Sequence, residues 1–330
     1  MARVVRFAQT GGPEVLRVED INVASPKQGE VRIKVEALGL NRAECMFRAG
    51  QYLEVPQFPA HIGYECAGVV ESIGAGVAGF KVGDRVSTIP AFGMTQYGSY
   101  GELVNMPAHA VAAYPANLSA EQGAAIWMQY VTAWCGLIEL GKLKAGQTVL
   151  VTAASSSVGL AALQIAKAGG AQTIAATRKP DKKAKLLAAG ADHVVVTEQE
   201  DLPARVMAVT GGKGANIIFD PVSGPYVDTL AQAAAHDAKI FIYGLLDARP
   251  TPFPLYASFQ KGIWVRAFAL FEFTLQPAAL ARAKEFIISG LASGALKPII
   301  DPASFTLDRI VEAHRYMESN NQFGKIVVRV

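Results

Sequence analysis

Residues 148–168 read TVLVTAASSSVGLAALQIAKA, and this stretch decides the fold. Thr148 to Thr152 form a continuous apolar run, which is typical of a strand buried on both faces of a sheet. Small residues then form a short turn, and Val158 to Ala168 have the apolar spacing of a helix that packs one face against a core. A strand, a tight turn and a helix in this order predict the first unit of a parallel α/β sheet.

The same alternation continues downstream. We expect further strands at 173–176, 193–197, 217–220 and 239–243, and a helix over Asp181–Ala189 with Gly190 just beyond it. Apolar strands that alternate with amphipathic helices predict a parallel sheet covered on both faces. We assign this doubly wound, Rossmann-type domain to residues 123–295.

The first third of the chain is rich in β-strand signals. Glu30 to Leu38 (EVRIKVEAL) alternates apolar and polar residues, and 66–73 and 84–89 are similar short runs separated by glycines. Short strands with glycine turns predict a compact, barrel-like β domain. Residues 324–330 (GKIVVRV) are expected to be a strand that returns to it, so we assign this domain residues 1–122 and 296–330. Between the domains, Ser119 with Gln122 predicts a capping box that opens a long Ala-rich helix.

Composition excludes several classes of protein. The 330 residues carry a net charge of +3 with no block of like charge, so nucleic acid is not expected as a partner. The most apolar stretch, Ala267 to Leu275, is too short to span a bilayer and contains Glu272, so a membrane is not expected. The sequence opens MARVVRFAQTGG, without an apolar signal core, so secretion is not expected either. The three cysteines and five histidines are isolated, which predicts a cytoplasmic protein without a metal site.

The turn between Thr152 and the following helix is a candidate phosphate-binding loop. It reads AASSSVG (153–159), with one glycine where a dinucleotide fingerprint has three. Its side chains are all small, and three serine hydroxyls are available to a phosphate at the helix N-terminus. The alternative is an ordinary β–α turn with no ligand.

The end of the second strand indicates which dinucleotide binds. An acidic residue at this place would hold the ribose 2′-hydroxyl of NAD. Here the strand runs into Arg178-Lys179-Pro180-Asp181-Lys182-Lys183, with no acid at the strand end and four cations after it. Cations suit a 2′-phosphate, so the sequence predicts NADPH. The alternative is a solvated helix start.

Ordered segments along the chain carry a family resemblance. They are GLN (39–41), RAGQY (48–52), GYECAGVV (63–70), GVAGFKVGDRV (76–86), GSYGEL (98–103), AASSSVGLAALQIAK (153–167), LLAAGADHVV (186–195), GGKGANIIFDPV (211–222) and QFGKIVV (322–328). In this order the chain resembles the medium-chain dehydrogenase/reductase superfamily, and more narrowly its zinc-free, zeta-crystallin-like quinone oxidoreductases. The resemblance implies an α/β fold: a GroES-like β-rich catalytic domain, a Rossmann domain, and an active-site cleft between them.

The resemblance also implies roles for particular residues. It makes Asn41, Tyr52 and Tyr64 the candidate catalytic residues. The residues implied in cofactor binding are Asn41, Thr132, Ser155, Ser156, Ser157, Val158, Gly159, Arg178, Lys182, Gly244, Phe268, Gly324 and Lys325. The chain departs from the family pattern where Ser156 and Ser157 replace two glycines, and also at Thr197 and Met46.

The same resemblance implies that no metal is bound. Asn41, Tyr64 and Met128 stand where zinc alcohol dehydrogenases have their ligands, and none of these side chains replaces the thiolates and imidazole that zinc prefers. From the residues alone, other roles stay open: Asn41 as the cap of a turn, Tyr52 and Tyr64 as half-buried structural residues, and Glu65 as a structural acid.

These features predict an NADPH-dependent reductase of quinones or similar conjugated carbonyl compounds. Without a Lewis acid, alcohol oxidation is disfavoured, whereas conjugation spreads the charge that hydride addition creates. One alternative is a reductase of the carbon–carbon double bond of enals, enones or enoyl thioesters; another is a non-catalytic binding protein on the same fold. We also expect a homodimer that pairs Gly262 to Leu270 (GIWVRAFAL) as an exposed apolar strand at the edge of the Rossmann sheet.

Overall fold

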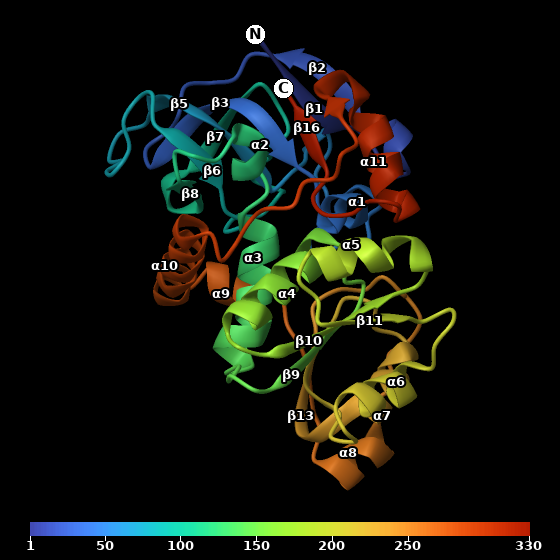
Figure 1. The fold of residues 1–330 in the computed structure, drawn as a ribbon. Coiled ribbons are helices and arrows are strands. Elements are labelled where there is room, and N and C mark those ends of the chain that lie inside the picture. Colours follow the sequence, from blue (N-terminus) through green and yellow to red (C-terminus); the bar gives the residue numbers. More distant parts are fainter. The chain divides into compact units, whose positions relative to one another are not determined.

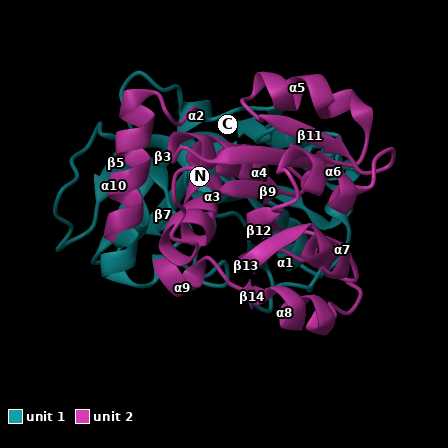
Figure 2. Cartoon of the chain, turned by 60° about the horizontal axis from the view of Figure 1, so that its bottom comes forward, with its two compact units in different colours: residues 1–128, 274–280, 298–330 teal, residues 129–273, 281–297 magenta.

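A computed structural model describes residues 1–330, which divide into two compact units (Figures 1 and 2). Unit 1 comprises residues 1–128, 274–280 and 298–330, and unit 2 comprises residues 129–273 and 281–297. The domain boundaries expected from the sequence, after residues 122 and 295, stay a prediction.

Unit 1 is built on a seven-stranded sheet with the order β15-β16-β3-β5-β6-β8, in which β7 also pairs with β3. The expected strand at 30–38 is β3, and the C-terminal strand β16 pairs antiparallel with it. The strands are β3 (Glu30–Gly39), β5 (Glu65–Ile73), β6 (Arg85–Thr88), β7 (Leu103–Pro107), β8 (Val111–Ala113), β15 (Phe305–Thr306) and β16 (Val327–Arg329). A second sheet has the order β2-β1-β4, from β1 (Ala2–Phe7), β2 (Arg17–Ile21) and β4 (Ala60–His61).

A buried polar cluster lies between α1 (Arg42–Arg48) and α11 (Ile310–Ser319) of unit 1. Arg48 Nη1 lies 2.8 Å from His314 Nδ1. Because arginine only donates, this ring nitrogen accepts. His314 is fully buried, and burial together with the Arg48 charge lowers its pKa from 6.5 to about 3. The histidine is therefore a neutral core residue.

Unit 2 contains a six-stranded sheet in which every strand is parallel to its neighbours. The order β11-β10-β9-β12-β13-β14 is that of a doubly wound dinucleotide-binding sheet, with its topological switch point between β9 and β12. The strands are β9 (Thr148–Val151), β10 (Gln172–Thr177), β11 (His193–Val196), β12 (Ala215–Asp220), β13 (Ala234–Ile242) and β14 (Trp264–Ala267). Leu150, Ile174, Val195, Ile218 and Ile240 form the centre of its core.

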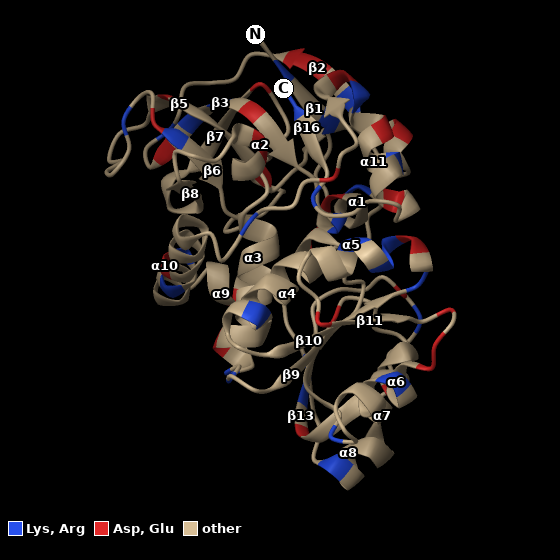
Figure 3. Ribbon diagram, in the orientation of Figure 1, with Lys and Arg blue, Asp and Glu red and all other residues tan.

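The helices alternate with the strands of unit 2 as expected, although some differ in extent. The helix that follows the serine turn is α4 (Ser157–Ala168), and the remaining helices are α2 (Ala120–Gly123), α3 (Trp127–Trp134), α5 (Lys183–Ala188), α6 (Leu202–Val209), α7 (Tyr226–Ala233), α8 (Leu255–Lys261), α9 (Phe271–Thr274) and α10 (Pro277–Ser293). No helix combines the length and the apolar character needed to cross a membrane. Acidic and basic residues are interspersed, for example along α11 (Figure 3).

Three expected elements differ in extent. The Ser119 capping box forms, because Gln122 N donates to Ser119 Oγ and Ser119 N donates to Gln122 Oε1. The helix it opens is not long, however: α2 ends after four residues, and after α3 the chain forms a π-helix over Cys135–Leu140. The helix expected over 181–189 begins as a 3₁₀ turn, Pro180–Lys182, and the strand expected over 262–270 spans only Trp264–Ala267.

Candidate functional site

The candidate cofactor residues of unit 2 gather at one edge of its sheet. Because all six strands are parallel, their carboxyl ends lie along the same edge, which is where doubly wound sheets bind ligands. The serine turn follows β9 at the switch point, Arg178 follows β10, Gly244 comes two residues after β13, and Phe268 follows β14. The sheet therefore brings together residues that are up to 113 positions apart in the sequence.

The turn after β9 holds the N-terminus of α4. Ser156 caps the helix by accepting a hydrogen bond from Gly159 N at 3.0 Å, and Leu160 N bonds to Ser156 O. The N–H groups of Ser157 and Val158 remain at the helix start, where the helix dipole favours an anion. Where the dinucleotide fingerprint has a glycine, this chain has the Ser156 side chain, which caps the helix. The helix start is therefore ordered without a ligand.

Gly159 is required by close packing. A Cβ atom at this position would lie 2.7 Å from Ala154 Cα and O and 2.8 Å from Ala153 O. These are backbone atoms, which cannot move away as a flexible side chain would. Ala153 has a φ of 43°, a left-handed conformation that costs a residue with a Cβ about 1–2 kcal/mol. The single glycine of the turn therefore serves the contact between helix and strand.

A polar network joins the ends of β9 and β12 at the switch point. Thr152 Oγ1 donates to Asp220 Oδ1, and Ser223 N donates to Asp220 Oδ2 at 2.7 Å. Burial raises the pKa of Asp220. Next to Gly244, Tyr243 stacks on Phe219 with 4.1 Å between ring centroids, and its buried hydroxyl faces the Ser156 side chain without completing a hydrogen bond of ordinary geometry. An orphan donor at this edge fits a bound phosphate or ribose oxygen.

The end of β10 carries the expected cations. Arg178 is exposed directly after Thr177, and Lys182 is partly buried with its Nζ 3.3 Å from Ser155 Oγ. Lys182 therefore reaches from the second β–α connection to the serine turn of the first. No acid occupies the strand end itself.

The other candidates of unit 2 are placed as follows. A Cβ at Gly244 would lie 2.9 Å from Pro221 O, so the chain segments after β12 and β13 are closely packed here. Phe268 is buried, and its N–H donates to Ile242 O at 3.0 Å. Thr132 is buried on α3.

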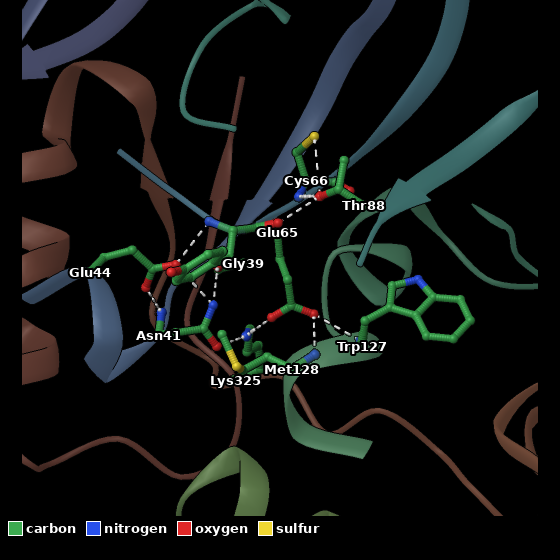
Figure 4. Close-up of polar contacts among 10 residues, drawn as sticks. Gly39, Asn41, Glu44, Glu65, Cys66, Thr88, Trp127, Met128 and Lys325 are labelled. Carbon is green, nitrogen blue, oxygen red and sulfur yellow. Dashed lines mark hydrogen bonds and ion pairs between the residues drawn. The ribbon is translucent and has the colours of Figure 1, made fainter. Parts of the chain in front are cut away.

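In unit 1, Lys325 is the centre of a buried charged network (Figure 4). Its side chain is fully buried; Nζ forms an ion pair with Glu65 Oε2 and donates to Asn41 Oδ1 at 2.5 Å. Glu65 Oε1 accepts from Trp127 N at 2.8 Å and from Met128 N at 2.9 Å. Glu65 thus caps the first turn of α3 from a neighbouring strand. Gly324, with φ 96°, provides the turn that precedes Lys325.

Glu44 holds Asn41 from the opposite side. Its Oε1 accepts from Asn41 Nδ2 at 3.0 Å and from Tyr64 N at 3.1 Å, and its Oε2 accepts from the Asn41 N–H. Asn41 is the residue before α1 and serves as its N-cap, as one of the two open interpretations expected. Its backbone N–H donates to the side chain of Glu44, three residues on. Complete burial raises the pKa of Glu44 from 4.5 to about 7, while Lys325 opposes this rise.

Tyr52 and Tyr64 lie close together, with 6.3 Å between their ring centroids. Tyr64 is fully buried, and its hydroxyl donates to Glu54 Oε1 at 3.2 Å. Glu54 also accepts from Met94 N and Thr95 N, which fastens the loop that carries Tyr52. Burial raises the pKa of Tyr52 to about 12 and raises that of Tyr64 further. Both are therefore neutral hydroxyl groups at physiological pH.

Sequence reasoning did not identify Glu44 or Glu54, and it did not pair Lys325 with Glu65. The spacing of Asn41 and Glu44 is that of a capping box, so this signal was present in the sequence. Glu65 accepts hydrogen bonds from the first turn of α3 and pairs with Lys325, which fits the structural role left open for it. No group of three His, Cys, Asp or Glu side chains is arranged to hold a metal ion.

A doubly wound sheet with a turn of small residues at its switch point, in a chain with a separate β unit, is an architecture found among nicotinamide-dependent oxidoreductases. Residues 27–116 match the family described as the alcohol dehydrogenase GroES-like domain, and residues 157–287 match the family described as zinc-binding dehydrogenase.

Individual relatives extend the likeness over the full length. The quinone oxidoreductase of Homo sapiens is 32% identical over 333 residues, which cover 99% of this chain and 98% of the relative. The structure of Escherichia coli quinone oxidoreductase complexed with NADPH is 29% identical, has a TM-score of 0.89, and is covered along 100% of both chains. The CurK enoyl reductase, 24% identical with a TM-score of 0.88 over 99% of each chain, shares the fold. The chain therefore belongs to the medium-chain dehydrogenase/reductase superfamily, in its zinc-free quinone oxidoreductase branch.

Proposed function

We propose that the chain is an NADPH-dependent reductase of quinones or similar conjugated carbonyl acceptors, and that it works without zinc. One observation carries the choice of cofactor: Lys182 reaches the serine turn and Arg178 stands at the end of β10, where an acid would select NAD. A 2′-phosphate at this place would meet both cations.

The residues of unit 2 fit a dinucleotide. The free N–H groups of Ser157 and Val158 suit a pyrophosphate, and Gly159 keeps the helix close to the strand. Burial raises the pKa of Tyr243, so its orphan hydroxyl remains a neutral donor for the cofactor. An ordered helix start argues against the alternative in which Ser156 has abolished cofactor binding.

Bound NADPH would supply a hydride, which with one proton reduces a quinone by two electrons to the hydroquinone and leaves NADP⁺. The chain has to orient the acceptor and offer a donor to its developing oxyanion. Tyr52 is the candidate donor, since it is a neutral hydroxyl on a loop fastened by Glu54. Reduction of an enone double bond uses the same groups and stays the second candidate, supported by the same tyrosine.

The chemistry around Asn41 supports zinc independence. A zinc site needs thiolate, imidazole or carboxylate ligands. The three corresponding positions hold an amide, a phenol that donates to Glu54, and the thioether of Met128. The Lys325 ammonium moreover lies 2.5 Å from Asn41 Oδ1 and supplies a fixed positive charge there.

Two measurements test this function. Fluorescence titration with NADPH and NADH should give tighter binding of NADPH; a preference for NADH would contradict the role of Arg178 and Lys182. NADPH consumption should then be followed with a panel of quinones and enones after prolonged dialysis against a chelator. Loss of activity on dialysis that added Zn²⁺ restores would refute zinc independence, and turnover of enones alone would favour the second candidate.

We further propose a cytoplasmic homodimer formed through β14. β14 is an edge strand of the six-stranded sheet, and Trp264 on this strand is 70% exposed. Tyr256 and Phe259 on α8 are 83% and 79% exposed, which extends the apolar surface. An unpaired apolar edge favours pairing with a second copy. The three free, buried cysteines fit a reducing compartment. Sedimentation should give a dimer that Trp264→Arg dissociates, while a monomeric wild-type protein would refute the proposal.

A further inference from the structure

Tyr64 lies in the middle of a chain of three hydrogen-bonded side chains in unit 1. Its hydroxyl donates to Glu54 Oε1 at 3.2 Å, and its ring centroid lies 6.3 Å from that of Tyr52. Burial raises the pKa of Tyr52 to about 12, and a hydrogen bond from Tyr64 opposes this rise. Since that bond stabilises the Tyr52 phenolate, Tyr64 is the donor when Tyr52 gives up its proton. The Tyr64 hydroxyl therefore has an acceptor on either side.

The middle of this chain is dry, whereas its two ends are not. Tyr64 is fully buried, and its ring packs against Phe92 with 5.5 Å between centroids. Tyr52 and Glu54 are both partly exposed. Glu54 Oε2 accepts from the hydroxyl of the exposed residue Thr95 at 2.9 Å. The chain thus leads from one partly exposed group to another through a side chain that water does not reach.

The carboxylate at one end of the chain is held in place by backbone groups. Its Oε1 also accepts from Met94 N at 3.3 Å, and its Oε2 accepts from Thr95 N at 3.2 Å. These donors keep Glu54 facing the Tyr64 hydroxyl. A buried tyrosine with a structural role needs only one partner for its hydroxyl. Tyr64 has a second one in Tyr52, and this second partner calls for an explanation.

We propose that Tyr64 and Glu54 form a proton relay that resupplies the hydroxyl of Tyr52. The inference rests on the proposed function, in which Tyr52 donates to the oxyanion created by hydride transfer, and it deepens that function. Reduction of a quinone or an enone takes one hydride from NADPH and one proton, so a proton has to reach the acceptor in every turnover. Tyr64 and Glu54 act through Tyr52 and are positioning residues.

The protons move along the chain without a net change in the protein. The Tyr52 O–H bond breaks as the O–H bond of the acceptor forms, and the Tyr64 proton moves to Tyr52. A proton that Glu54 takes from water then restores the Tyr64 hydroxyl. The shift is concerted, because burial raises the pKa of Tyr64 far above its ordinary value and disfavours an isolated phenolate there. The sum of these steps is one solvent proton delivered to the acceptor.

Tyr64→Phe tests the relay, because it keeps the ring against Phe92 and removes only the hydroxyl. Thr95→Val is the matched control, since it removes one hydrogen bond to Glu54 and leaves the path to Tyr52 intact. With a quinone as acceptor, Tyr64→Phe should lower kcat at least about tenfold, part of what a positioned proton donor contributes. Its affinity for NADPH in fluorescence titration should equal that of wild type, and Thr95→Val should keep the wild-type kcat.

Two readouts separate a relay from a structural role. At constant pH and ionic strength, added imidazolium should raise the kcat of Tyr64→Phe and leave that of wild type unchanged, because an external acid replaces the missing relay. In the free protein, with an NMR-active carbon label at tyrosine Cζ, Tyr64→Phe should shift the Tyr52 resonance and Thr95→Val should not. A wild-type kcat in Tyr64→Phe, a loss that imidazolium does not reverse, or an unmoved Tyr52 resonance overturns the proposal.

The failure of the proposed function would look different. In that case the wild-type protein itself would not consume NADPH with any quinone or enone, or Tyr52→Phe would keep the wild-type kcat, and the relay would fail with it. A wild-type protein that turns over and a slow Tyr52→Phe variant, combined with a Tyr64→Phe variant of wild-type rate, refute only the relay.

Discussion

The buried carboxyl group of Glu44 gives a quantitative prediction for stability. Its pKa rises from 4.5 to about 7 chiefly because burial disfavours the charged form. Each tenfold change in proton affinity is worth about 1.4 kcal/mol, so the folded state binds this proton more strongly than the unfolded state by about 3 kcal/mol. This contribution to stability is fully present below pH 4.5 and is lost as the pH rises through 7.

Replacing Glu44 by glutamine removes this titration. Urea unfolding should be measured at a series of pH values from 4.5 to 8. Across this range the free energy of unfolding of the variant should rise relative to that of wild type by about 3 kcal/mol. Glu102→Gln is the control, because hydrogen bonds from Arg3 lower the pKa of Glu102, so this group titrates below the range and the variant should run parallel to wild type across it. A difference between wild type and Glu44→Gln that is constant with pH, or that favours wild type as the pH rises, would refute the electrostatic account of the site.

Three further predictions concern cofactor binding and the core. In fluorescence titrations, Lys182→Ala should weaken NADPH binding about tenfold and leave the affinity for NADH unchanged. The control Lys167→Ala, at the other end of α4, should alter neither affinity. Equal losses of affinity for both cofactors would contradict the 2′-phosphate role. Gly159→Ala should destabilise the protein by about 1–3 kcal/mol in thermal unfolding and weaken NADPH binding, and wild-type values for both would show that the turn tolerates a Cβ. Burial and Arg48 lower the pKa of His314 to about 3, so wild-type stability should fall as the pH drops from 6.5 toward 3, and His314→Asn should flatten this acid limb in urea unfolding.

Local patterns in the sequence predicted the architecture well. The alternation of residues 30–38, the apolar run of β9 and the amphipathic α4 each reflect burial within one element, so a short window contains the signal. The prediction of a long helix after Ser119 was wrong, because α2 ends after four residues. Its alanines favour a helix, but tertiary contacts such as the capping of α3 by Glu65 decide where helices begin.

The candidate site was predictable only in part. The serine turn and the cations after β10 lie at strand ends, and the order of a doubly wound sheet brings strand ends together. The Lys325–Glu65 ion pair joins positions 260 residues apart, and no local pattern specifies such a contact. In the same way, the buried His314 and Arg48 could be paired only after the packing of α1 and α11 was known.

The place of Lys325 in the chain has a consequence for synthesis on the ribosome. Glu65 and Asn41 are made early, yet the ammonium that compensates them, and the strand β16 that completes their sheet, come 260 or more residues later. Unit 2 is contained almost entirely between these segments. At a rate of about 5–20 residues per second, the first unit must wait on the order of tens of seconds for its last strand, while the sheet of unit 2 is already complete. We therefore expect the incomplete β unit of the nascent chain to be accessible to chaperones and proteases during this interval.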